Sequence, residues 1–502
     1  MKNLNQFETP LFDALQSYVN NETIPFHVPG HKKGHGMDRQ FRDYIGINAM
    51  SIDVTVFEQV DSLHHPSGAI AAAQALAAEA FHADHTFFGV HGTSGAIQAM
   101  ILSVLREGEK VIIPRNVHKS VTAGLALSGA VPVYVQPELD PLTGTALNVT
   151  PGTIQKALEQ HLDAKAVLVI NPTYFGVAAD LEAIVDVVHG HGIPLMVDEA
   201  HGPHLCFHEE LPISAMEAGA DICAQSTHKI IGSLTQSSML HVREGLVDPR
   251  RVQTAMNLLH TTSPSYILLA SLDVARRQMA TEGTKIMEDT LTLARQARQR
   301  INAIKGFSCF GEENMGQPGF FGFDPAKLTI TCRELGLSGQ QLEKILAREY
   351  FIQPELSDLY NVLCTLSMGN TQEQVDALVE ALEAIGATYG NTVTLHDPEE
   401  AYMEMPRIPL LMLSPRDAMH CDTTPIVLSD SIGRISAEFL MAYPPGIPVL
   451  CPGEMITEDV VQYIETQRAA GLWIQGTEDP EVKTIRVVNH HHLQAVENQH
   501  IG

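Results

Sequence analysis

Between residues 86 and 224, short apolar runs alternate with amphipathic segments of helical length. Near-continuous apolar strands separated by helices are typical of an α/β fold with a mostly parallel sheet covered on both faces. The apolar runs predict strands at Thr86–Val90, Val111–Pro114, Val131–Val135, Ala166–Ile170, Ile193–Val197 and Ile222–Ala224. The segments between them predict helices at Ser94–Leu105, Lys119–Ser128, Ile154–His161, Leu181–His189 and Ile213–Ala218. Because ligands collect beyond the C-terminal ends of such strands, we expect chemistry just after each apolar run.

The flanking segments predict further domains. Residues 1–35 combine a short helical stretch with the Gly- and Pro-rich FHVPGHKKGHG, which favours an arm over a core element. A long helical stretch from about Tyr266 to Ile304 leads into a strand–helix–strand–helix pattern and then a Pro-rich segment. We therefore expect an N-terminal arm at 1–35, a major domain at 36–285, a small α+β domain at 286–390 and a C-terminal domain at 391–502.

Composition narrows the possible partners. The 502 residues include 32 basic and 59 acidic side chains, a formal net charge of −27. This balance disfavours nucleic acid and anionic membranes, which attract clustered Lys and Arg, and favours a cationic substrate. No run approaches the ~18 apolar residues of a membrane span. Seven scattered cysteines are typical of reduced thiols, so we expect a cytoplasmic protein.

Two strand ends carry candidate chemistry. The first predicted strand is followed by HGTSGA, where Thr93 and Ser94 open a helix. Hydroxyls and free backbone N–H groups at a helix N-terminus suit a phosphate, although an ordinary N-cap uses the same residues. The fifth strand ends in Asp198, within VDEAH. A helicase-like ATPase needs a GxxxxGK[ST] loop that the sequence lacks, and a zinc site at His201, His204 and His208 lacks the HExxH spacing.

The next strand is followed by QSTHK, which places Lys229 at a strand end, 229 − 198 = 31 residues after Asp198. Most lysines are simply solvated. A phosphate-binding helix start, a strand-end Asp and a downstream Lys are, however, the three groups that a pyridoxal-phosphate enzyme requires. Their combination predicts that cofactor and no metal.

Ordered motifs along nearly the whole chain resemble the Orn/Lys/Arg decarboxylases, and most of all their short Gram-positive-type arginine decarboxylases. These motifs are TPLFDAL, FHVPGHKKG, DSLHHPSGAI, DHTFFGVHGTSGA, RNVHKS, INPTYFG, VDEAHGPH, QSTHK, TTSPSY, GRISAE and YPPGIPVLCPGE. The resemblance implies a pyridoxal 5′-phosphate enzyme of the aspartate-aminotransferase-like fold (fold type I), with residues 36–285 binding the cofactor. It also implies a homodimer or higher homo-oligomer with shared active sites.

The same resemblance assigns roles. It implies that Lys229 forms the Schiff base, Asp198 pairs with the pyridinium nitrogen, His118 stacks on the cofactor ring and His201 lines the pocket; we expect all four to be catalytic. The implied phosphate ligands are Thr93, Ser94, Ser226 and His228, with Thr262 and Ser263 reaching the partner subunit's phosphate.

The implied reaction is decarboxylation of a basic amino acid, first arginine to agmatine for polyamine synthesis, then lysine to cadaverine, then ornithine. A carboxylate must meet the cationic end of such a substrate, and we expect Glu454, followed by Glu355 and Asp358. A loop acid hydrogen-bonded to backbone is the alternative for Glu454. An aminotransferase would need an arginine for the substrate α-carboxylate, and none stands out near these motifs.

Overall fold

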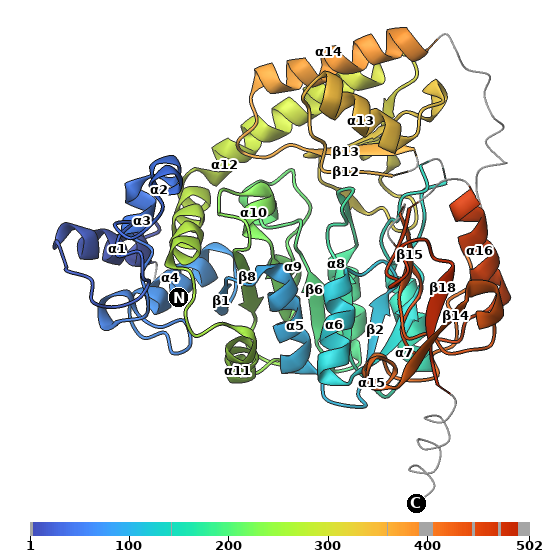
Figure 1. Cartoon of the computed structure of the whole chain (residues 1–502), viewed down its shortest axis with the longest axis horizontal. Coiled ribbons are helices and arrows are strands. Elements are labelled where there is room, and N and C mark those ends of the chain that lie inside the picture. The colour runs from blue at the N-terminus through green and yellow to red at the C-terminus, as the bar shows by residue number, and fades with distance from the viewer. Residues whose placement is uncertain are drawn as a thin grey trace, which may run out of the picture. The chain divides into compact units, whose positions relative to one another are not determined.

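The computed structural model describes residues 4–141, 143–358, 360–390, 405–443, 447–469 and 473–489. The chain divides into two compact units. The first comprises residues 1–104, 181–292 and 367–369, and the second comprises residues 105–180, 293–366 and 370–502. Helix α12 (Tyr266–Asn302) begins in the first unit and ends in the second (Figure 1).

The first unit carries four strands in the order β1-β8-β7-β6. Its strands are β1 (His85–Gly89), β6 (Leu195–Asp198), β7 (Ile222–Gln225) and β8 (Ser238–Val242). Its helices are α1 (Pro10–Asn20), α2 (Arg39–Ile45), α3 (Ile47–Ser51), α4 (Ala69–Ala80), α5 (Gly92–Val104), α8 (Leu181–Gly190), α9 (Ala215–Ala218), α10 (Thr227–Ile230) and α11 (Pro249–Leu259), with α12 following. Strands β6 and β7 are parallel, whereas β8 is antiparallel to both of its neighbours.

The N-terminal helix is fastened to α12 by a buried ion pair. Arg276 donates to Asp273 (2.8 Å) and to the backbone oxygen of Glu8 (2.6 Å). Asp273 in turn accepts the N–H groups of Leu11 and Phe12 at the start of α1. Both charged side chains are fully buried, so each depends on the other and on these backbone groups for compensation.

Helix α4 is anchored by Asp61. The Asp61 carboxylate accepts hydrogen bonds from the N–H groups of Ser67, Gly68, Ile70 and Ala71, which satisfies the open donors of the first helical turn. Burial raises the pKa of Asp61, but these backbone donors more than offset it, and the net pKa lies below its ordinary value. The carboxylate therefore stays ionised at the helix N-terminus, where negative charge is stabilising.

The second unit carries the parallel strand order β4-β2-β3 and several small antiparallel sheets. The strands of the parallel group are β2 (Lys110–Pro114), β3 (Val131–Val135) and β4 (Ala164–Ile170), with helices α6 (Lys119–Ser128) and α7 (Pro151–Gln160). The later elements are β5 (Val177–Ala178), β9 (Ser308–Cys309), β10 (Gly322–Phe323), β11 (Lys327–Thr331), α13 (Gly339–Glu349), β12 (Leu356–Ser357), β13 (Asn361–Thr365) and α14 (Gln372–Tyr389). The C-terminal elements are α15 (Pro415–His420), β14 (Thr423–Val427), β15 (Leu440–Tyr443), β16 (Pro448–Leu450), α16 (Glu458–Ala469), β17 (Trp473–Gln475) and β18 (Thr484–Val488).

The predicted α/β fold with a mostly parallel sheet is confirmed. All six predicted strands form, and α6 has the predicted bounds, Lys119–Ser128. The sequence pattern did not predict β8, whose 12-residue connection to β7 (226–237) is short enough for antiparallel neighbours. The bounds predicted for the four domains stay predictions.

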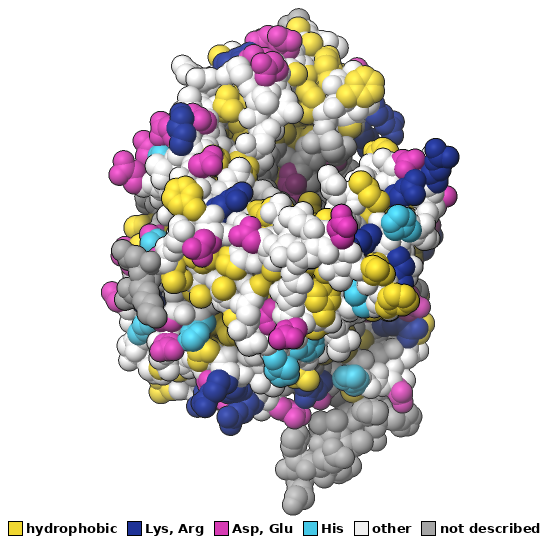
Figure 2. Space-filling view, turned by 90° about the vertical axis from the view of Figure 1, so that its left-hand side faces the viewer, with side chains coloured by type: hydrophobic (Ala, Val, Ile, Leu, Met, Phe, Trp, Pro, Cys, Tyr) yellow, Lys and Arg dark blue, Asp and Glu magenta, His cyan; other side chains and the backbone are white. Residues whose placement is uncertain are grey.

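The N-terminal segment leaves large apolar side chains exposed. Ile24, Phe26 and Tyr44 are 76%, 93% and 89% exposed. Figure 2 views the molecule from the side of α1–α3 and shows apolar side chains on that face. Exposed apolar side chains at such density are typical of surfaces that contact another protein.

Candidate active site

Lys229, His201 and Asp198 come together at the C-terminal ends of β6 and β7. Asp198 is the last residue of β6, His201 follows three residues later, and Lys229 lies in the short helix α10 just after β7. The Lys229 Nζ and His201 Nε2 atoms are 2.7 Å apart. A proton can therefore pass between the amine and the imidazole without any movement of the backbone.

Asp198 is a buried carboxylate that can accept further hydrogen bonds. Its Oδ1 accepts one hydrogen bond, from the N–H of Ala200 at 3.1 Å. Burial raises its pKa above the ordinary value, while the nearby Lys229 charge and the Ala200 N–H oppose that shift. A cationic N–H donor placed against Asp198 would restore ionisation, because an opposite charge favours the charged form.

The hydroxyls of Thr93 and Ser226 meet although they are 133 residues apart in sequence. Thr93 lies in the first turn of α5, and its Oγ1 is 2.5 Å from the Ser226 Oγ, just after β7. Both side chains are buried, whereas the neighbouring Ser94 is exposed. Two hydroxyls and the open N–H groups at the start of a 13-residue helix are donors of the kind that bind a phosphate.

The remaining predicted phosphate ligands differ in their surroundings. The His228 Nδ1 lies 2.8 Å from the backbone oxygen of Ser237 and must donate to it, which places a proton on Nδ1. Thr262 and Ser263 are exposed in the loop between α11 and α12, and the Ser263 N–H donates to Thr261 Oγ1. Their exposure agrees with the predicted contact to a partner subunit, which stays a prediction.

A buried polar chain, which the sequence did not indicate, lies beside Asp198. Glu199 accepts from the Ala215 N–H (2.7 Å) and from Gln225 Nε2 (2.8 Å). The Gln225 Oε1 accepts from His241 Nε2 (3.0 Å), and His241 Nδ1 bonds the Thr86 hydroxyl (2.8 Å). This chain links β6, β7, β8 and β1. Burial raises the pKa of Glu199 to about 8 and lowers that of His241 to about 3.

His118 is the N-cap residue of α6 in the second unit. Its Nδ1 accepts the Ser120 N–H at 3.2 Å and lies 2.8 Å from the Ser120 hydroxyl. An acceptor nitrogen carries no proton, so the ring proton of neutral His118 is on Nε2. The ring is half-buried and its orientation is fixed by the start of the helix.

Glu454 forms a buried ion pair with Arg115. The Arg115 NH1 and NH2 groups donate to the two carboxylate oxygens at 2.5 and 2.7 Å, and the Cys451 N–H donates to Oε2 at 2.7 Å. Neither charged side chain is more than 2% exposed. The predicted role of Glu454 in substrate binding stays a prediction, but these contacts correspond to the structural alternative.

The other two predicted substrate ligands lie near β12 and β13. Asp358 is buried and accepts from the N–H groups of Tyr360 and Asn361. Burial raises its pKa to about 6, against the effect of the Asn361 side chain. Glu355 is exposed, and within the described residues its carboxylate accepts no hydrogen bond. Of the three candidates, Glu355 therefore has the most accessible carboxylate.

The zinc alternative finds no support in the side-chain geometry. His201 bonds Lys229, and His208 Nε2 bonds Glu288 at 2.9 Å. In the described part of the chain, no three or more His, Cys, Asp or Glu side chains are grouped as metal ligands would be.

Over the same described ranges, no helix has both the length and the apolar character needed to cross a bilayer.

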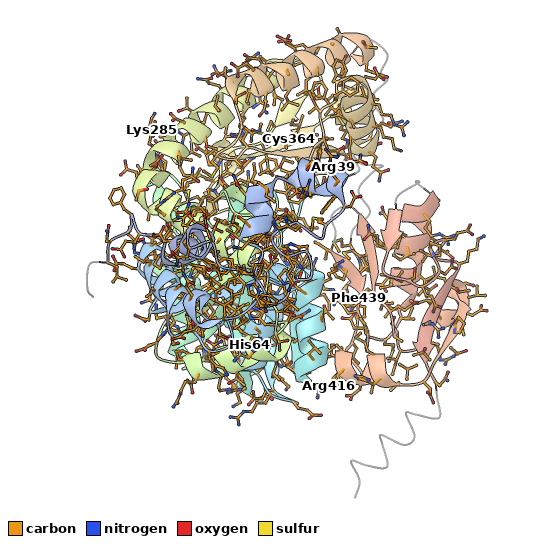
Figure 3. All side chains as sticks on the ribbon, turned by 60° about the vertical axis from the view of Figure 1, so that its left-hand side comes forward. Arg39, His64, Lys285, Cys364, Arg416 and Phe439 are labelled. Carbon is orange, nitrogen blue, oxygen red and sulfur yellow. The ribbon has the colours of Figure 1, made fainter. Side chains whose placement is uncertain are left out.

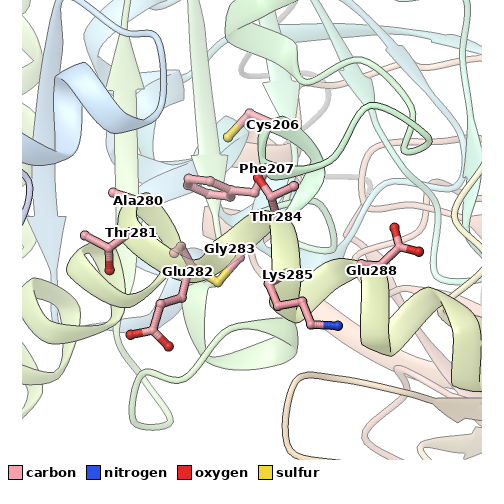
Figure 4. Close-up of a pocket in the computed structure, with 10 residues that line it drawn as sticks. Cys206, Phe207, Ala280, Thr281, Glu282, Gly283, Thr284, Lys285 and Glu288 are labelled. Carbon is pink, nitrogen blue, oxygen red and sulfur yellow. The ribbon is translucent and has the colours of Figure 1, made fainter.

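A separate pocket of about 490 Å³ lies along α12 in the first unit (Figure 4). Cys206 and Phe207 face residues 279–285 and Glu288 of the helix across it. None of the predicted site residues lines this pocket. Lys285 is paired with Asp289 at 2.6 Å and is largely solvated, and Glu282, which also lines the pocket, is exposed.

Comparisons with known proteins place this geometry in a family. The model of the Orn/Lys/Arg decarboxylase major domain matches residues 9–374, and that of the C-terminal domain of the same family matches residues 399–482. The chain is 52% identical to the arginine decarboxylase of Halalkalibacterium halodurans over 486 residues, which cover 97% of this chain and 99% of that protein. This chain therefore belongs to the Orn/Lys/Arg decarboxylase family.

Two solved structures show how widely the fold is shared. The lysine decarboxylase LdcF of Francisella novicida matches with a TM-score of 0.84 and 23% identity, covering 96% of this chain and 81% of that one. Ureidoglycine-glyoxylate aminotransferase from Bacillus subtilis matches with a TM-score of 0.52 and 16% identity, covering 66% and 87%. At these identities the likeness concerns the fold alone, and it confirms the predicted aspartate-aminotransferase-like architecture.

Proposed function

We propose that this protein is a pyridoxal 5′-phosphate-dependent arginine decarboxylase that converts L-arginine to agmatine and carbon dioxide. The observation that carries the proposal is the 2.7 Å contact between Lys229 and His201 beside the buried Asp198, in a chain of the Orn/Lys/Arg decarboxylase family. The high identity to a named arginine decarboxylase supports arginine as the substrate. We further propose that the enzyme works in the cytoplasm and that its product feeds polyamine synthesis.

The residues present fit this cofactor. Lys229 supplies the amine for its aldehyde, Asp198 supplies a buried carboxylate for its ring nitrogen, and Thr93 and Ser226 supply hydroxyls for its phosphate. When bound, pyridoxal phosphate supplies a sink for the electron pair released as the bond between Cα and the carboxylate breaks.

The chain's own residues would control protons and position. The Lys229 amine must be neutral to bond an aldehyde, and His201 Nε2 at 2.7 Å can accept its proton. Asp198, ionised against a ring N–H, would hold that proton on the ring nitrogen. Either member of the Lys229–His201 pair could return a proton to Cα once carbon dioxide has left. His118 would stack on the ring, with its orientation set by Ser120.

Recognition of the substrate's cationic end needs a carboxylate. Glu355 is our first candidate because its carboxylate is accessible, whereas Asp358 and Glu454 are already hydrogen-bonded. Replacing Glu355 by Gln should raise KM for arginine with little change in kcat, since the charge acts on binding. An unchanged KM would remove Glu355 from the substrate site.

The proposal is tested by measuring carbon dioxide release from arginine, lysine and ornithine in parallel on one purified sample supplied with pyridoxal phosphate. We expect the highest kcat/KM for arginine, with agmatine as product and no 2-oxo acid. Faster release from lysine would overturn the substrate assignment, and 2-oxo acid formation would indicate an aminotransferase. Lys229→Ala should abolish turnover and the visible absorbance of the lysine-bound cofactor, whereas Lys285→Ala, which changes an exposed side chain of α12, should retain both.

We also propose a homo-oligomer in which Thr262 and Ser263 complete the phosphate site of the partner subunit. The exposed apolar side chains of residues 24–47 and the exposure of both hydroxyl residues support this proposal. Mixing inactive Lys229→Ala with the double variant Thr262→Ala/Ser263→Ala should regenerate activity, because exchange of subunits creates one intact site. Absence of any recovery, with exchange demonstrated by labelled subunits, would refute shared sites.

A further inference from the structure

Two motifs of the C-terminal segment, GRISAE (433–438) and CPGE (451–454), are hydrogen-bonded to each other around Glu454, the last residue of CPGE. The Ser436 N–H donates to the Glu454 backbone oxygen at 2.9 Å, and the Gly453 N–H donates to the Ser436 oxygen at 2.8 Å. Glu454 also forms a β-bridge with Leu411. At Gly453 φ is +92°, and an added Cβ would lie 2.2 Å from the Leu413 oxygen, so only glycine fits. The backbone of Glu454 is therefore held from two sides.

Both carboxylate oxygens of Glu454 accept hydrogen bonds from groups of the protein itself. Arg115 engages both carboxylate oxygens, and its Nε donates to the Pro448 oxygen at 2.7 Å. The guanidinium also lies 4.5 Å from the centre of the Tyr134 ring. Burial raises the pKa of Cys451 to about 12 and that of Tyr134 well above its usual range, so both neighbours are neutral. One cation and one anion compensate each other, which leaves no charge for a substrate guanidinium.

Arg115 is the first of only four residues, 115–118, that connect β2 to α6, and His118 is the last. The C-terminal segment thus fixes one end of the connection that carries His118. It also holds the far end of α6, where Arg416 donates to the backbone oxygens of Ala126 (2.9 Å) and Leu127. Figure 3 shows Arg416 beside this helix.

We propose that Glu454 and Arg115 are positioning residues that hold the 115–118 connection, and with it His118, in its working orientation. The C-terminal CPGE motif would then act on the cofactor site through Arg115 instead of touching the substrate. This inference rests on the proposed function for the role of His118 as the residue that stacks on the cofactor, but the anchoring of the connection does not.

The test combines amide hydrogen exchange with a double-mutant cycle on the full-length protein supplied with pyridoxal phosphate. Glu454→Gln should raise exchange in peptides covering residues 116–122 by about tenfold, because it removes the charge that holds Arg115. It should also weaken pyridoxal phosphate binding about tenfold in the wild-type background and less than about twofold in a His118→Ala background, because the effect passes through His118.

Several results would overturn the inference. They are unchanged exchange at 116–122, equal weakening of cofactor binding in both backgrounds, or a raised KM for arginine at unchanged cofactor affinity. Asp273→Asn, which disturbs the buried pair with Arg276 in the other unit, is the control and should leave exchange at 116–122 unchanged. If it raises exchange there equally, general destabilisation explains the effect and the inference fails.

A second variant and the exchange measurement cover the cases in which Glu454→Gln does not fold or the wild-type protein does not bind the cofactor. If Glu454→Gln does not fold, the double variant Arg115→Met/Glu454→Met removes both charges together and should fold, yet show the same loose connection and weak cofactor binding. Wild-type behaviour of that double variant overturns the inference. If the wild-type protein fails to bind pyridoxal phosphate at all, the proposed function fails, whereas the exchange measurement still decides whether Glu454 anchors the connection.

Discussion

Glu199 is a buried acid next to Asp198, and its replacement tests whether burial raises its pKa and thereby makes the stability of the protein depend on pH. In Glu199→Gln the new amide can donate to Gln225 Oε1, whose own amide then donates to His241 Nε2 while His241 Nδ1–H donates to Thr86. Every link of the observed chain is kept with its direction reversed. The variant therefore removes a titratable group from the interior and keeps the links of this chain, although the Thr86 hydroxyl and the Cys223 thiol, which lies 3.5 Å from Glu199 Oε2, lose their acceptors.

The size of the effect follows from the pKa of Glu199. Burial raises it from 4.5 to about 8. Between these values the folded state binds more protons than the unfolded state, so the contribution of Glu199 to stability is intact below pH 4.5 and is lost as pH rises to about 8. At pH 7 the loss spans 7 − 4.5 = 2.5 pH units, or about 3 kcal/mol at about 1.4 kcal/mol per unit. Glutamine does not titrate and avoids this loss.

The assay compares thermal unfolding of the two proteins at pH 6, 7 and 8. We expect Glu199→Gln to be more stable at pH 7 by up to about 3 kcal/mol, a rise in Tm of about 3 °C for a chain of this length. The advantage should grow by about 1.4 kcal/mol per pH unit from pH 6 and level off above pH 8. Glu282→Gln, which changes an exposed side chain of α12, is the control and should show no such trend. A pH-independent difference, or a less stable variant at pH 7, would refute the reasoning.

Three further changes test other parts of the structure. Asp61→Ala removes the acceptor at the start of α4 and should lower the free energy of unfolding by about 1–3 kcal/mol, whereas Asp61→Asn should lose less; chemical denaturation measures both. Arg276→Ala leaves Asp273 buried without its cation and should cost about 3–5 kcal/mol; a cost below about 1 kcal/mol would show that the pair is not buried in solution. Thr93→Val should weaken pyridoxal phosphate binding about tenfold in an absorbance titration while leaving the Tm of the cofactor-free protein unchanged; unaltered affinity would remove Thr93 from the phosphate site.

The strand-end rule accounts for most of what the sequence could predict about the site. Asp198 and Lys229 follow neighbouring parallel strands, so their proximity required only the order of the strands and the rule that their carboxyl ends share one edge. Thr93 and Ser226, 133 residues apart, also follow strands whose carboxyl ends share one edge, but β8 lies between β1 and β7 in the sheet, so the order of the predicted strands alone does not bring these two hydroxyls together. In each case a local signal, an apolar run that ends at a polar residue, fixes a position in space.

The position of a residue at a strand end does not predict contacts that depend on how one side chain packs against another. Glu199 differs from Asp198 by one position along the strand end, so it points to the opposite face, and nothing in the sequence indicates that Gln225 and His241 meet it there. Strand β8 was missed for a related reason. Its sequence SMLHV places two polar residues, Ser238 and His241, within a fully buried run, and His241 is acceptable there because Gln225 and Thr86 bond it.

The contact that Glu454 makes is of the chemical kind expected for it, but its partner belongs to the chain itself. We expected the Glu454 carboxylate to meet the cationic end of a substrate, and it does meet a planar guanidinium through two hydrogen bonds, but that guanidinium belongs to Arg115, 339 residues earlier in the chain. A substrate guanidinium would have to displace Arg115 from a pair that is almost wholly buried, and a displaced arginine would need a new anion in the interior. Since an internal pair forms at no cost in translational entropy, the internal guanidinium wins this competition. On this argument we expect the cationic end of the substrate to meet the accessible carboxylate of Glu355 and neither of the two buried candidates.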